Sequence, residues 1–118
     1  MAVFIDVECY KDYFLFCAKN SKSGKITKIP MHADCKLNKE LLGEILKVEL
    51  ISFNGNNYDL PIISGALAGW DCQKLHKLSN QIILSDKPTY QILKDKDLTV
   101  KNYNHIDLIE VAIGVASL

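Results

Sequence analysis

The sequence predicts an α/β domain with a mixed sheet, in which antiparallel strands come first and parallel strands follow. Three observations lead to this prediction. The chain has 118 residues, a length typical of one domain. Its hydrophobic fraction of 48% and charged fraction of 24% are those of a globular protein. The residue patterns follow the order β-β-β-α-β-α-α-β, with helices between the later strands. We therefore expect residues 1–118 to form a single domain.

The first third of the chain predicts a three-stranded meander. An apolar run at residues 3–5, continued by Val7, indicates a buried strand that begins almost at the N-terminus. Residues 13–18 are rich in aromatic side chains and strand-like, and residues 20–25 have the composition of a turn. Residues 25–31 then alternate polar and apolar side chains, the pattern of a half-exposed strand.

The middle of the chain predicts helices around one further strand. Residues 38–47 carry apolar side chains at helical spacing, with Asn38 as the expected N-cap. Residues 48–53 return to a strand pattern. Residues 58–67 are expected to be helical, with Pro61 tolerated in the first turn. After a break at residues 69–71, residues 72–83 predict another helix.

The last third is less regular. Residues 85–101 predict a polar, irregular segment with one short apolar spot at Tyr90, Ile92 and Leu93. Residues 104–111 predict a strand that runs into a helix.

The composition of the chain argues against several classes of protein. Fourteen positive and fourteen negative residues give a net charge of zero, and every positive residue is Lys. Without Arg the chain has no planar fork for guanine or phosphate, so a stand-alone sequence-specific DNA reader is disfavoured. The four cysteines have no paired spacing for zinc or disulfides, which favours reduced thiols in a cytoplasmic protein. We expect neither a signal peptide nor a membrane segment.

Three acids are candidates for a metal site. Asp6 and Glu8 are two residues apart on a strand, so their carboxylates point to the same face. Taken alone, this pair favours two solvated acids at a strand end, although a divalent cation would also suit it. Asp59 follows the predicted strand at residues 48–53, at an edge where α/β sheets place their sites. An acid that only stabilises the start of a helix is the equal alternative for Asp59.

Together these fragments resemble the DEDD-type 3′–5′ exonucleases. Phe4-Ile5-Asp6-Val7-Glu8 is similar to their first motif, and Phe53-Asn54-Gly55 with Tyr58-Asp59-Leu60-Pro61 is similar to their second. His105-Ile106-Asp107-Leu108 resembles the strand that follows in proofreading domains of phage and family B-like DNA polymerases. The resemblance implies an RNase H-like fold with the sheet order 3-2-1-4-5.

The resemblance also implies an activity and its residues. Such enzymes hydrolyse phosphodiester bonds at the 3′ end of single-stranded DNA with two Mg²⁺ or Mn²⁺ ions about 4 Å apart. By resemblance, Asp6 would bind both ions, Glu8 one and Asp59 the other. Asn54, Gly55 and Tyr58 would lie against the substrate, and Asp107 would be a structural or rim acid.

One departure from the family limits the expected activity. The family's third motif, a Tyr or His followed by an Asp on a helix after the last strand, is absent from the sequence. The two-metal site is then incomplete, and each missing group lowers the rate by a factor of about 10² or more. We therefore expect a C-terminally truncated, partial exonuclease domain of the DNA-replication type, weak or inactive as it stands. The rest of a polymerase or a second copy is its expected protein partner, in the cytoplasm of a bacterial or phage-infected cell. The alternative is a non-catalytic RNase H-like phage module that binds a protein or nucleic acid.

Overall fold

The computed structural model describes residues 1–111 of the chain. The described elements are β1 (Ala2–Tyr10), β2 (Tyr13–Asn20), β3 (Ile26–His32), α1 (Lys39–Ile45), β4 (Glu49–Ser52), α2 (Asp59–Leu67), α3 (Cys72–Leu84), α4 (Thr89–Asp95) and β5 (His105–Asp107). Residues 108–111, directly after β5, are helical. The expectation of a truncated C-terminus without the third motif falls on residues 112–118, which lie outside the described residues.

The five strands form one sheet with the order β3-β2-β1-β4-β5. β1 pairs with β2 and β2 with β3 in antiparallel fashion, whereas β1 pairs with β4 and β4 with β5 in parallel. This arrangement confirms both the mixed sheet and the order 3-2-1-4-5. The tight turn between β1 and β2 permits antiparallel pairing, while the parallel strands need the helical crossovers that α1 and the α2–α4 segment provide.

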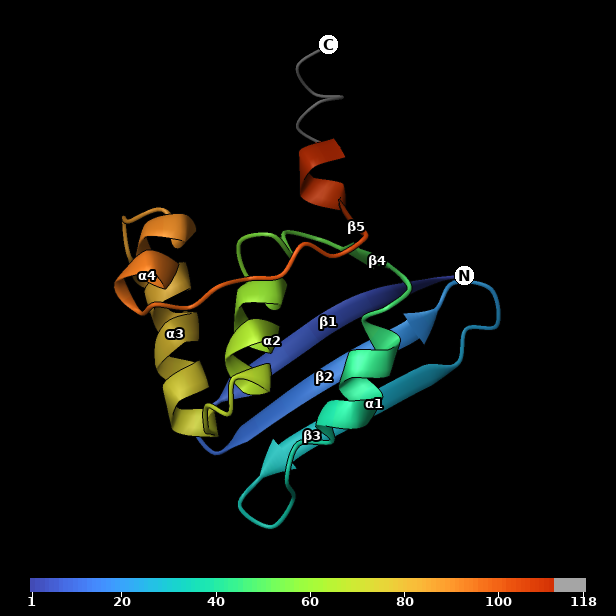
Figure 1. Ribbon diagram of the computed structural model, residues 1–118, viewed down its shortest axis with the longest axis horizontal. Helices are drawn as coiled ribbons and strands as arrows, with labels where there is room; N and C mark the ends of the chain where they lie inside the picture. The colour runs from blue at the N-terminus through green and yellow to red at the C-terminus, as the bar shows by residue number, and fades with distance from the viewer. Residues whose placement is uncertain (112–118) are drawn as a thin grey trace.

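Only one face of the sheet is covered in the part of the chain that the structure describes. The helices α1, α2 and α3 lie over that face, and α4 packs on α3 (Figure 1). The Cα atoms extend only 21 Å along the shortest axis, as expected of two layers. Between the layers lies the core, with Phe14, Phe16, Ile62 and Leu78 fully buried. Among residues 1–111, no helix combines the length and the apolar character needed to cross a bilayer.

Strand β1 illustrates this division between the faces. Val3, Ile5 and Val7 are buried under the helices, while Phe4, between them, points to the other face and is 43% exposed. The expectation of a buried strand therefore holds for alternate residues only. A continuous apolar run does not tell which of the two faces is covered, because successive side chains point in opposite directions.

Two helices show what local sequence signals captured and missed. The Asn38 side chain accepts a hydrogen bond from the Leu41 N–H at 3.1 Å, so the predicted N-cap of α1 is confirmed. By contrast, α4 forms within the segment that was expected to be irregular. Ile92 is buried against the core, and this packing holds a seven-residue helix that is too short to form on propensity alone.

Candidate functional site

The candidate site forms where β4 is shorter than β1. β4 pairs with β1 only as far as the Phe4–Ile51 register and ends at Ser52, while β1 continues to Tyr10. Within residues 1–111, the edge of β1 after Phe4 therefore has no strand partner on this side. Asp59, the first residue of α2, occupies the gap, and its Oδ1 accepts the Val7 N–H at 3.1 Å. A bond between residues 52 positions apart thus fixes a carboxylate beside the middle of β1.

Asp59 is a buried acid with an unfavourable environment for its charge. Its side chain is only 4% exposed. Burial, followed by the negative charge of Asp6, raises the pKa of Asp59 to about 7. The Val7 N–H and the backbone N–H of Asp59 itself oppose this shift, and the charge of Asp107 adds to it. Among the described residues the ion pairs are Lys47–Glu44 and Lys87–Asp95, so no lysine neutralises Asp59. Binding a proton, or a cation in its place, relieves this unfavourable charge.

Asp6 and Glu8 project from the face of the sheet that the helices leave open. Both are exposed and flank Val7, whose N–H binds Asp59. Cross-strand neighbours on the same face are Cys17 for Asp6 and Leu15 for Glu8. The negative charge of Asp6 thus acts on Asp59 at this edge of β1, and Glu8 lies two residues further along the strand.

Residues 1–111 contain no group of three or more His, Cys, Asp or Glu side chains arranged to hold a metal ion. The three acids expected to bind metal, Asp6, Glu8 and Asp59, therefore do not form such a group. Mg²⁺ commonly binds through one or two carboxylates and completes its shell with water and substrate phosphates. Asp6 and Asp59 fit that mode, because they supply hard oxygen ligands and their mutual repulsion is not offset by any described lysine.

The loop between β4 and α2 is held in place by Asp107 of β5. Asp107 is 4% exposed, and its Oδ1 accepts the Asn54 N–H at 2.7 Å while its Oδ2 accepts the Asn56 N–H at 3.1 Å. It also accepts the Ile109 N–H at 3.1 Å. Asn54 has a left-handed backbone with φ of 65°, which the short Asn side chain tolerates. Asp107 therefore fixes the loop that positions Asp59, and we call Asp107 with these three hydrogen bonds the loop brace.

A hydrogen-bonded chain of side chains completes this brace. Asn56 Nδ2 donates to Glu110 Oε1 at 2.8 Å, which directs Asn56 Oδ1 toward His105 Nδ1 at 3.1 Å. His105 Nδ1 then carries the proton, and Nε2 accepts from the Ser52 hydroxyl at 2.6 Å. Burial lowers the pKa of His105, in agreement with a neutral ring. The Ser52 oxygen in turn accepts the Gly55 N–H at 3.0 Å.

The three residues expected to lie against the substrate have different surroundings. Gly55 is buried, and a Cβ at this position would overlap the Ser52 hydroxyl, so packing inside the protein already requires a glycine. Tyr58 is half-buried, and its hydroxyl pairs with Ser79 of α3 at 2.8 Å. Asn54 is half-buried, and its Oδ1 accepts from Asn57 Nδ2 at 3.3 Å. All three belong to the loop next to Asp59.

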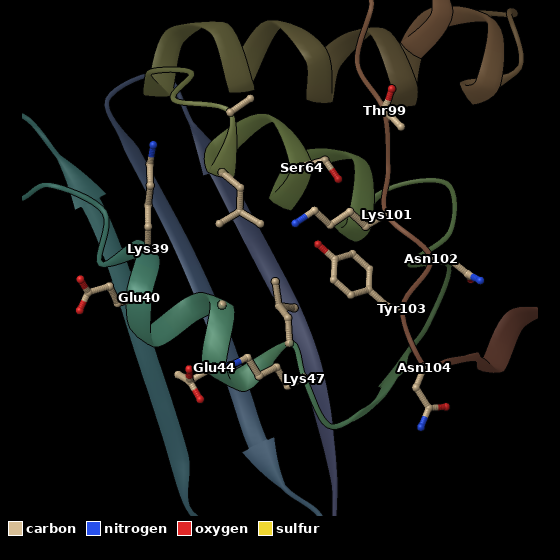
Figure 2. A pocket seen from close by; sticks show the side chains of 14 residues that line it. Lys39, Glu40, Glu44, Lys47, Ser64, Thr99, Lys101, Asn102, Tyr103 and Asn104 are labelled. Carbon is tan, nitrogen blue, oxygen red and sulfur yellow. Dashed lines mark hydrogen bonds and ion pairs between the residues drawn. The ribbon is translucent and has the colours of Figure 1, made fainter.

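Sequence reasoning missed a cavity at the other end of α2. It has a volume of about 840 Å³ and lies between α1, the second half of α2 and residues 99–104. Figure 2 shows the Lys101 amine and the Tyr103 hydroxyl pointing toward one another beside α2. Ser64, which also lines the cavity, follows Asp59 by five residues, so the cavity is separate from the acids at the helix start. Its lining comes from three segments that are distant in the sequence, so no local motif predicts it.

Comparison of the chain with protein-family models, with curated proteins and with solved structures finds no match.

Proposed function

We propose that the chain is a divalent-metal-dependent nuclease domain of the 3′–5′ exonuclease type, which acts on the 3′ end of single-stranded DNA with low efficiency. The observation that carries this proposal is the buried, unneutralised Asp59 held against β1 beside Asp6. The sheet order agrees with the fold that such a domain needs, and the loop brace keeps Asp59 at the carboxyl end of β4, where α/β sheets bind ligands.

Each acid has a distinct role in this proposal. Asp59 is held by the Val7 N–H so that its other oxygen can bind a hard cation. Asp6 supplies the second carboxylate from the exposed face of β1, and Glu8 lies next along that face for a second ion or its water. These acids would hold Mg²⁺ or Mn²⁺, which would neutralise charge at the phosphate and lower the pKa of a water bound to it. We place this activity in DNA replication, in the cytoplasm of a bacterial or phage-infected cell.

The test is a nuclease assay on 5′-labelled single-stranded DNA in Mn²⁺. We expect slow shortening from the 3′ end, abolished by a chelator and by Asp6→Ala or Asp59→Asn. Asp86→Ala is the matched control, since Asp86 is exposed in the α3–α4 connection. Wild-type cleavage that persists unchanged in Asp59→Asn would refute the proposal, because the activity would then come from elsewhere.

A second function, a non-catalytic binding module, is favoured by one observation. The described residues provide no three-ligand metal group, so the site offers fewer protein ligands than a two-ion centre uses. In this case the chain would bind DNA or a protein partner without cleaving DNA. Binding measured by fluorescence anisotropy that is unchanged by Asp6→Ala and by metal removal, together with no cleavage, would support the module and contradict the nuclease.

A further inference from the structure

The face of the sheet that no described helix covers has an ordered pattern of side chains. We call it the open face and define it by the residues that alternate with the buried ones in β1–β5. From β3 to β5, the strand registers arrange it in four rows, namely Ile26–Lys19–Phe4–Ile51–Ile106, Lys28–Cys17–Asp6, Pro30–Leu15–Glu8 and His32–Tyr13–Tyr10. Nine of these fourteen side chains are aliphatic, aromatic or thiol groups, and Phe4 and Ile106 are 43% and 40% exposed.

An open face of this kind is unusual for the strands that form it. β1, β4 and β5 pair in parallel, and parallel strands are normally covered on both faces because helical crossovers pack on them. Neighbouring apolar side chains at Phe4, Ile51 and Ile106 form a continuous strip across these three strands. Apolar side chains also occupy this face of β2 and β3, at Leu15, Pro30 and Ile26, and exposed apolar patches mark docking sites more often than solvated faces.

Two opposite charges on the open face are not paired with one another within the described chain. Lys28 of β3 and Asp6 of β1 stand in the same row, on either side of Cys17 of β2. Two strand spacings place their backbones about 10 Å apart in the plane of the sheet, and no ion pair joins them in the described structure. Both side chains are exposed on the same face. A second, inverted copy of this row would meet each charge with its opposite.

We propose that the open face binds a second copy of this chain, face to face, about a two-fold axis that runs along β2. Rotation about such an axis places β1 of each copy over β3 of its partner and leaves β2 over β2. β4 and β5 then extend past the partner's β3, so the dimer covers Phe4 and leaves Ile51 and Ile106 outside the contact. Each Asp6 then faces a Lys28, each Phe4 faces an Ile26, and Leu15 and Cys17 each meet their own counterpart. Packed sheets lie about 10 Å apart with their strands within about 30°, a gap that Lys and Asp side chains bridge.

One contact opposes this dimer and helps to test it. Lys19 lies on β2, in the row of Phe4, so the axis places two Lys19 side chains near one another. Their length lets the amines turn outward to water, but the repulsion weakens the association. Lys19→Ala should therefore tighten the dimer. The dimer would also cover Asp6 and Glu8, two acids of the proposed nuclease site, so DNA could reach them only in the monomer.

A charge-exchange experiment tests the geometry by sedimentation velocity. In Asp6→Lys the new lysine faces Lys28 of the other copy, and in Lys28→Asp the new aspartate faces Asp6. The dissociation constant of the dimer should therefore rise about a hundredfold in each variant alone. Mixed in equal amounts, the two variants should form a heterodimer in which both pairs are opposite in charge. A misfolded variant would fail to associate in the mixture, so recovery excludes that explanation.

The outcomes separate this inference from the proposed function because sedimentation does not depend on nuclease activity. A wild type that stays monomeric at every accessible concentration overturns the dimer, and so does a mixture that does not associate. As an independent check, a short bis-maleimide should cross-link two chains through Cys17, with loss of the product in Cys17→Ser and its retention in Cys35→Ser. Equal cross-linking in Cys17→Ser would contradict the axis along β2.

Discussion

Asp59 and Asp107 are equally buried, at 4% exposure each, but the protein treats their carboxylates differently. Asp107 accepts three backbone N–H groups, from Asn54, Asn56 and Ile109, and so closes the loop around it. Asp59 accepts the Val7 N–H and interacts with its own backbone N–H, and the charge of Asp6 acts on it. The comparison teaches that burial alone does not mark a functional acid. The number of donors that satisfy the carboxylate separates the brace from the candidate ligand.

The largest expected effect is the pH dependence of the free energy of unfolding that Asp59 causes. The pKa of Asp59 is raised to about 7 in the folded protein and is near 3.8 when unfolded, so the folded state holds a proton that the unfolded state releases. The free energy of unfolding should therefore fall as pH rises from about 4 to about 7, and level off above. The linked change is on the order of 4 kcal/mol without metal.

Asp59→Asn isolates this contribution. Asn keeps the acceptor for the Val7 N–H but has no charge, so the variant should lose this part of the pH dependence and be more stable than the wild type at pH 8. Urea denaturation of both proteins at several pH values measures the difference. His105, whose lowered pKa acts in the opposite direction, is common to both and cancels. Parallel curves for the two proteins would show that Asp59 does not carry the shift.

The next largest effect concerns the brace. Asp107→Ala removes the acceptor of three backbone N–H groups. The N–H groups of Asn54 and Asn56 then lose their partner in the loop between β4 and α2. We expect a loss of about 3 kcal/mol in the free energy of unfolding, because bonds to a charged acceptor contribute about 1.5 kcal/mol or more each and partial rehydration offsets some of this. Denaturation at pH 8 checks it. A loss no greater than that of Asp59→Ala would break the distinction between the two acids.

The sequence predicted the fold better than it predicted the site. The meander followed from alternation and turns between neighbouring residues, and the order 3-2-1-4-5, expected from the resemblance, is confirmed. The position of Asp59 near Asp6 required only that β4 and β1 be neighbours, so it too could be anticipated. What could not be read locally depends on distant pairs. His105 binds Ser52 across 53 positions, and only this network explains why residue 55 is a glycine.

The open face escaped prediction for a related reason. The sequence shows Phe4 among apolar neighbours, but burial of Phe4 depends on whether anything covers the second face of the sheet. The α4 helix is the converse case, since contact with the core makes Ile92 buried in a segment with few local helix signals. In both places tertiary contacts, which no short pattern encodes, decide the outcome.

The most direct test of the central claim is the effect of Mg²⁺ and Mn²⁺ on thermal stability at pH 8. If Asp59 and Asp6 form a cation site, metal should raise the melting temperature of the wild type and leave Asp59→Asn unchanged, with Asp86→Ala responding like the wild type. A stabilisation of about 1 kcal/mol would raise the melting temperature by about 4 °C or more. A wild type that does not respond, or a variant that responds equally, would contradict the account.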